Sequence, residues 1–199
     1  AGHKIAGQLG GRYEDYNFII CHLGGGITVN AHEKGRIIDS HINAFSPERA
    51  GALPMIAFTK KCFSGEWDYD AAFKRQMGGG GLVAYLGTSD IQEVERRIDA
   101  GDEKADFYFN AMIYQIAKDI GGMATVMNGQ VDRVILTGEI ARSARLAEGA
   151  GGVHRPRGGG SRSGGDAGSG GWNAADAPGR GACAGLRHGA KRLKKDGTT

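Results

Sequence analysis

Two hydrophobic patterns divide the chain, and the first is typical of strands. Residues 16–21 (YNFIIC) are a short run of aromatic and β-branched side chains that leads toward three consecutive glycines. Residues 27–32 alternate between apolar and polar side chains, and residues 36–39 (RIID) follow a Glu-Lys-Gly turn. These segments predict a three-stranded antiparallel meander whose first turn contains the three glycines.

The second pattern is helical, because apolar side chains recur at steps of three and four. The predicted helices cover residues 53–63, 68–77, 90–100 and 103–127, the last with the longest apolar stripe. Asp68, Ser89 and Asp90 stand at positions where N-caps are expected. Gly121 and Gly122, late in the longest helix, predict close packing against a neighbouring element.

A further strand is predicted after the helices. Residues 131–136 (VDRVIL) form an apolar run that leads through Thr137 and Gly138 into a new helix start at Ile140. A meander, a block of helices, and then a strand, a glycine turn and a helix together predict an α/β domain.

Composition divides the chain near Leu146. The chain has 199 residues and 36 glycines, and 16 of these glycines lie in residues 147–199 beside a single aromatic residue, Trp172. This segment has a charge of +5, whereas the whole chain has +3. We predict a domain over residues 1–146 and a disordered Gly/Arg/Ala-rich tail over residues 147–199, because so few large apolar side chains cannot offset the lost backbone entropy.

Cysteine usage and hydropathy indicate the compartment. Cys21, Cys62 and Cys183 are far apart and form no CxxC pair, which argues against a disulfide framework and against a zinc site. The sequence has no apolar run of about 18 residues and no secretory signal pattern at its N-terminus. We expect a cytoplasmic protein that does not contact a membrane.

The triple-glycine turn is the first candidate for chemistry. In residues 21–26 (CHLGGG) the glycines allow backbone N–H groups to converge on an anion, because no Cβ blocks the approach of a phosphate. The spacing matches neither the Rossmann nor the P-loop pattern, and a plain hairpin turn is the alternative for this segment alone. Thr137-Gly138 is a second turn of this kind ahead of a helix, and two such turns suit a nucleotide held in a cleft.

Five stretches of the sequence resemble butyrate kinases of the acetokinase family, in the order in which the family has them. They are residues 22–39 (HLGGGITVNAHEKGRIID), 45–51 (FSPERAG), 80–90 (GGLVAYLGTSD), 114–121 (YQIAKDIG) and 134–141 (VILTGEIA). The family belongs to the sugar kinase, Hsc70 and actin superfamily, so the resemblance implies a ribonuclease H-like fold of the actin-like ATPase type. It also implies reversible, ATP-dependent phosphorylation of butyrate or a similar short-chain carboxylate to its acyl phosphate, with Mg²⁺ and a homo-oligomeric assembly.

The resemblance also implies roles for individual residues. His22 and Arg49 match family positions that face the transferring phosphoryl group, where a guanidinium reaches two oxygens at once. The implied nucleotide-binding residues are Gly24, Gly25 and Gly26 at the phosphates, and Thr137 and Gly138 near the adenosine. No residue is assigned as a metal ligand. Apart from the family, Arg49 is interpreted as a solvated loop arginine beside Glu48, and His32 and His41 as surface residues.

Four departures from the family pattern keep two other functions open. We expect the chain to be the C-terminal half of such a kinase, without the N-terminal domain that supplies the first phosphate motif. Residues 40–44 (SHINA) replace a longer loop, Glu139 replaces a glycine and adds negative charge, and the tail has none of the family's C-terminal helices. The alternatives are a non-catalytic nucleotide-binding remnant and a Gly/Arg-rich RNA-binding protein, although stacking on bases would depend on Trp172 alone.

Overall fold

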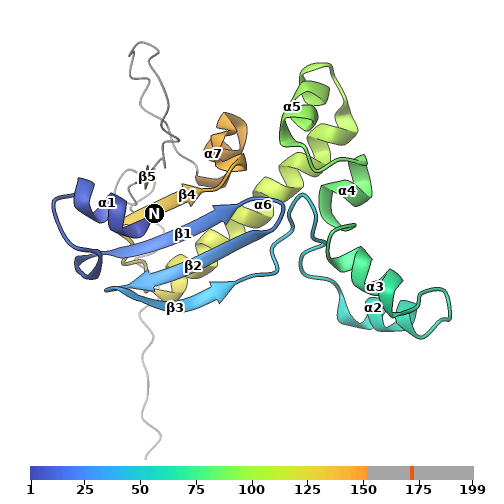
Figure 1. The fold of residues 1–199 in the computed structure, drawn as a ribbon, viewed down its shortest axis with the longest axis horizontal. Helices are drawn as coiled ribbons and strands as arrows, with labels where there is room; N and C mark the ends of the chain where they lie inside the picture. The colour runs from blue at the N-terminus through green and yellow to red at the C-terminus, as the bar shows by residue number, and fades with distance from the viewer. Residues whose placement is uncertain (152–170, 173–199) are drawn as a thin grey trace, which may run out of the picture.

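A mixed five-stranded sheet lies at the centre of the fold (Figure 1). The structure, a computed structural model, describes residues 1–151 and 171–172. The strand order is β3-β2-β1-β4-β5. The strands are β1 (Asn17–Leu23), β2 (Ile27–Glu33), β3 (Arg36–His41), β4 (Arg133–Thr137) and β5 (Gly171–Trp172).

The predicted meander is confirmed. β1 pairs antiparallel with β2, and β2 pairs antiparallel with β3. The turn between β2 and β3 needs left-handed backbone, with φ of 46° at Lys34 and 83° at Gly35, and a glycine adopts such values without strain. The sequence pattern did not predict the partner of the last strand, because β4 inserts beside β1 and runs parallel to it.

The helices follow the predicted order with small shifts at their ends. They are α1 (Gly2–Gln8), α2 (Met55–Cys62), α3 (Tyr69–Gln76), α4 (Gly81–Leu86), α5 (Ile91–Asp99), α6 (Glu103–Val126) and α7 (Ala144–Gly151), with short 3-10 helices at Tyr13–Asp15 and Ile140–Arg142. Asp68 and Asp90 cap α3 and α5, as predicted, by accepting hydrogen bonds from the backbone N–H groups of Ala71 and Gln92. Ser89 is not a cap, and neither α1 nor α4 was predicted.

Helix α6 buries its apolar stripe against one face of the sheet (Figure 1). The stripe consists of Phe109, Met112, Ile113, Ile116, Ile120 and Met123, which pack in one cluster with Ile19, Leu23 and Val29 of the sheet. The prediction of close packing at Gly121 and Gly122 was wrong for the described residues. Both glycines are exposed and no heavy atom lies within 4 Å of a Cβ added at either, because they face away from the stripe.

The interpretation of His32 as a surface residue was also wrong. Its side chain is on the polar face of β2, but α1 and Tyr13 cover that end of the sheet, and His32 is only 8% exposed. The Tyr13 hydroxyl forms a hydrogen bond with Nδ1 of His32. His41 at the end of β3 is half-buried, and its Nδ1 lies 2.9 Å from a carboxylate oxygen of Asp119 in α6.

We expect burial of His32 to make stability depend on pH. Burial lowers the pKa of His32 below its ordinary value of 6.5. Below that pH the unfolded chain takes up a proton that the folded chain does not bind. The contribution of His32 to the free energy of unfolding is therefore complete above pH 6.5 and declines as the pH falls. The free energy of unfolding, measured with urea, should fall less between pH about 7.5 and pH about 5.5 in His32→Gln than in the unmodified chain. An equal fall in the two proteins would show that groups other than His32 cause the pH dependence of stability.

The predicted division at Leu146 falls inside a helix. Leu146 is fully buried, and α7 continues to Gly151. Gly171 and Trp172 form the edge strand β5, antiparallel to β4, which the sequence pattern did not predict. The predicted disorder of residues 152–170 and 173–199 lies outside the described residues. In the described part of the chain, no helix has the length and hydrophobicity needed to cross a membrane.

Candidate functional site

The two predicted glycine turns meet at one edge of the sheet. In the parallel pair of β1 and β4, His22 is in register with Thr137, so both strands end side by side. The triple-glycine turn follows β1 and Gly138 follows β4. Gly138 has φ of 99°, and an added Cβ would overlap the backbone carbonyl group of Leu23. The Gly138 turn therefore packs against the backbone at the end of β1, next to the triple-glycine turn, and only glycine suits position 138.

Arg49 lies over the triple-glycine turn. A Cβ added at Gly26 would come within 2.5 Å of the guanidinium carbon of Arg49 and 2.7 Å of its Nη2. Nη1 of the same guanidinium donates a hydrogen bond of 3.1 Å to the carbonyl oxygen of Ile42. The structure thus brings Arg49 to the turn despite the short segment before it. It does not support the interpretation of Arg49 as a solvated loop arginine.

Hydrogen bonds fasten the loop that contains Arg49 to the turn. The hydroxyl of Ser46 and the backbone N–H of Glu48 both donate to the carbonyl oxygen of Gly25, at 2.8 and 3.0 Å. The Ser46 hydroxyl also accepts a hydrogen bond of 3.0 Å from the backbone N–H of Arg49. Ser46 is fully buried, so this hydroxyl is a structural link between the two loops.

A run of four glycines holds the loop from its other side. The backbone N–H groups of Gly78 and Gly80 donate to the carbonyl oxygen of Glu48, at 2.9 and 3.1 Å. Two N–H groups in the first turn of α4, at Leu82 and Val83, donate to the carbonyl oxygens of Ser46 and Pro47. Neither Ser46 nor this glycine run is assigned a role in the site by the sequence motifs. The run itself was the available signal, since four glycines permit close approach of two backbones.

The charges around the turn are mixed. Glu48 lies next to Arg49, and its carboxylate packs against Gly25, 2.9 Å from the position of an added Cβ. His22 is exposed, and its Nε2 lies 3.7 Å from the position of an added Cβ at Gly24. Glu139 is exposed beside the Gly138 turn. A positive and a negative side chain therefore both lie on the glycine turn.

The donor set suits a magnesium ion held mainly by phosphate. The described residues contain no group of three or more His, Cys, Asp or Glu side chains able to hold a metal ion. Mg²⁺ is usually bound through one or two carboxylates, substrate phosphates and water, rather than by an all-protein cage. The carboxylate of Glu48 on the turn supplies one such ligand. Mg²⁺ bound with a nucleotide thus fits these residues.

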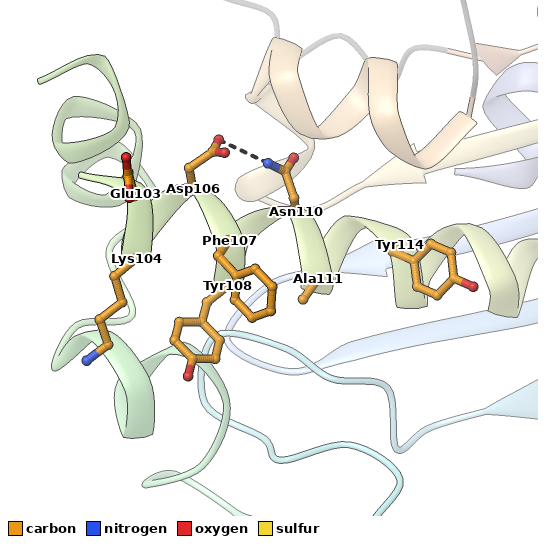
Figure 2. Close-up of a pocket in the computed structure, with 8 residues that line it drawn as sticks. All are labelled: Glu103, Lys104, Asp106, Phe107, Tyr108, Asn110, Ala111 and Tyr114. Carbon is orange, nitrogen blue, oxygen red and sulfur yellow. Dashed lines mark hydrogen bonds between the residues drawn. The ribbon is translucent and has the colours of Figure 1, made fainter. Parts of the chain in front are cut away.

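One hollow along α6 is separate from these turns. Figure 2 shows it with Phe107, Tyr108 and Tyr114 along the helix and a hydrogen bond from Asn110 to Asp106. None of its eight lining residues belongs to either glycine turn or to the Arg49 loop. The candidate site is therefore defined by backbone turns and charged side chains at the end of the sheet.

Solved structures define the class of fold. The crystal structure of Porphyromonas gingivalis acetate kinase aligns with a TM-score of 0.69 at 22% identity, over 74% of this chain and 39% of that one. A propionate kinase from Francisella tularensis aligns with a TM-score of 0.69 at 20% identity, over 75% of this chain and 40% of that one. The predicted α/β fold of the actin-like ATPase type is confirmed.

Sequence relatives identify the family. Residues 70–149 match the acetokinase family. Proteins named probable butyrate kinase from Listeria welshimeri and Listeria monocytogenes are each 50% identical over an alignment of 149 residues. The match covers 72% of this chain and 42% of each relative. The chain belongs to the acetokinase family and spans less than half the length of these relatives.

Proposed function

We propose that this chain is the nucleotide-binding part of an ATP-dependent carboxylate kinase, which phosphorylates butyrate or a similar short-chain fatty acid reversibly to its acyl phosphate. The observation that carries this proposal is the guanidinium of Arg49 held over Gly26, in a glycine turn that follows β1 beside the Gly138 turn that follows β4. The names of the Listeria relatives support the substrate class. ATP and Mg²⁺ are the proposed cofactors, and a cytoplasmic homo-oligomer is the proposed form.

Each residue at the site has a distinct proposed task. Gly24, Gly25 and Gly26 line the phosphates, and Thr137 and Gly138 face the nucleoside. The N–H of Gly24 donates to the carbonyl oxygen of Gly26 at 3.1 Å, so the backbone N–H groups proposed to bind phosphate are those of Gly25 and Gly26. Arg49 and His22 stabilise charge on the transferring phosphoryl group, because phosphoryl transfer depends on positioning and on charge stabilisation. Mg²⁺, when bound with ATP, neutralises charge on the phosphates.

A coupled assay for acyl phosphate formed from ATP and butyrate tests the proposal. Formation of acyl phosphate that depends on both substrates is the expected result. The second candidate function is a nucleotide-binding protein without catalysis. Titration with ATP in the absence of butyrate measures binding alone and, beside the coupled assay, distinguishes this candidate from the kinase. The specific observation that favours this candidate is Glu139, a carboxylate beside the turn proposed for the nucleotide. Binding without turnover, also when the part of a Listeria relative that the match does not cover is supplied, would favour it. The RNA-binding alternative depends on the tail and so lies outside the described residues.

Replacing Glu139 by glycine is expected to tighten ATP binding. The change removes a negative charge beside the phosphates and allows closer backbone approach, which together are worth about 1 kcal/mol or a few-fold in affinity. Isothermal titration with ATP measures the effect. Glu139→Gln is the matched control, since it removes the charge and keeps the bulk. Unchanged or weaker binding in Glu139→Gly would argue that this turn does not face the nucleotide.

A further inference from the structure

We propose that Glu48 makes the glycine turn selective for magnesium-complexed phosphates over free phosphate anions. The inference rests on the proposed nucleotide site and adds a determinant of which form of the nucleotide binds. Glu48 is not among the residues that the family resemblance assigns to the site. The proposal comes from the position of its carboxylate on the turn.

The Glu48 carboxylate lies against the middle of the turn. A Cβ added at Gly25 would lie 2.9 Å from Oε2 and 3.1 Å from Oε1 of Glu48, so both oxygens rest on the middle glycine. The guanidinium of Arg49 rests in the same way on the next glycine. The carboxylate and the guanidinium therefore lie on successive residues of one turn.

The backbone fixes this placement of Glu48. Its N–H donates to the carbonyl oxygen of Gly25, and its own carbonyl oxygen accepts from Gly78 and Gly80. The position of the main chain is thus set on two sides. Swinging the side chain is the remaining way to remove the carboxylate from the turn.

The carboxylate lacks a compensating partner in the described part of the chain. No lysine, arginine or histidine nitrogen lies within 4.0 Å of it there, and no described donor forms a hydrogen bond with it. Negative charge on the turn repels a free phosphate, which opposes the attraction of Arg49. A phosphate that arrives with Mg²⁺ reverses this effect, because a carboxylate oxygen is a preferred ligand of that ion. The same side chain then penalises free ATP and favours the magnesium complex.

The test is a two-by-two comparison of ATP affinity by isothermal titration of the full chain, without butyrate. ATP is titrated in EDTA and in excess MgCl₂, into the unmodified chain and into Glu48→Gln. The ratio of the dissociation constant in EDTA to that in MgCl₂ reports magnesium selectivity. We expect Glu48→Gln to tighten binding of free ATP, to weaken or leave unchanged binding of the complex, and to lower the ratio by on the order of tenfold.

Glu14→Gln is the matched control. Glu14 also packs on a turn glycine, Gly35, but through its Cγ and at the opposite end of the meander. In Glu14→Gln, the ratio of the dissociation constant of ATP in EDTA to that in MgCl₂ should equal the ratio of the unmodified chain. Glu48→Ala removes the same charge without an amide in its place, and should lower the ratio as Glu48→Gln does. Thermal unfolding of each variant shows that it is folded.

The outcomes separate this inference from the proposed function. If ATP binds and the ratio in Glu48→Gln equals that of the unmodified chain, the assignment of Glu48 is overturned and the nucleotide site stands. An equal fall of the ratio in Glu14→Gln would also overturn it, because net charge would then be the cause. If the unmodified chain and both Glu48 variants bind ATP in neither condition, the proposed nucleotide site is wrong and the inference falls with it.

Discussion

Replacing Arg49 by alanine is expected to lower turnover on the order of a hundredfold while ATP affinity changes far less. The guanidinium lies over Gly26 and can reach two phosphate oxygens at once. Charge on the transferring group is redistributed in the transition state, so a group aimed there contributes mainly to the barrier, by about 3 kcal/mol. Steady-state kinetics with ATP and butyrate, together with ATP titration, measure both quantities. If the chain alone does not turn over, the part of a Listeria relative that the match does not cover is supplied.

Two further variants test the same interpretation. Arg49→Lys should recover only part of the activity, since an ammonium group cannot reproduce the planar fork. His22→Ala should show a milder loss of turnover, because an imidazole contributes a single hydrogen bond. If these variants and Arg49→Ala lose turnover and ATP affinity in equal proportion, the two side chains are ground-state binders or structural supports. The catalytic roles would then be wrong.

Replacing Gly81 by alanine is expected to lower the free energy of unfolding by about 3 kcal/mol or more. Gly81 has φ of 56°, where a residue with a side chain costs about 1 kcal/mol. An added Cβ would also lie 2.8 Å from the carbonyl oxygen of Arg49 and 2.9 Å from that of Pro47, and nearer still to that of Ser46. The overlap is with backbone, which must shift, and we assign about 2 kcal/mol or more to it.

The control is Gly87→Ala at the other end of the same helix. Gly87 has φ of 78°, and nothing lies within 4 Å of its added Cβ, so this variant isolates the backbone cost of about 1 kcal/mol. Urea unfolding of both variants gives the difference. Gly81→Ala should also lower turnover, because the loop it displaces contains Arg49. Equal losses of stability in the two variants would show that the glycine run does not hold the loop.

Local patterns predicted the elements well, because each depends on residues near one another in sequence. The meander, α6 and the caps at Asp68 and Asp90 follow from periodicity and side-chain chemistry. The parallel pairing of β1 with β4 could not be predicted in this way, since it joins segments separated by five helices. His32 was misassigned for a similar reason. The alternation of β2 marks a polar face, but α1, which covers it, has no strong pattern.

For the candidate site too, features that depend on residues far apart in sequence could not be predicted from local patterns. The family resemblance named His22, Arg49 and both glycine turns, and the fold brings all of them to one edge of the sheet. Their functional roles stay predictions. Ser46 and the glycine run at 78–81 were not assigned, because their contribution is backbone geometry. The position of the Glu48 carboxylate depends on how two loops pack, which no local pattern specifies.

The parallel pairing of β1 with β4 also sets the order in which the site forms during folding. Phe18 pairs with Arg133, so forming this contact closes a long loop of intervening chain, which is entropically costly and slow. A ribosome releases the meander and its triple-glycine turn well before β4 emerges. Thr137 and Gly138 therefore join the site late, and a nascent chain released before β4 would contain the first turn without its partner.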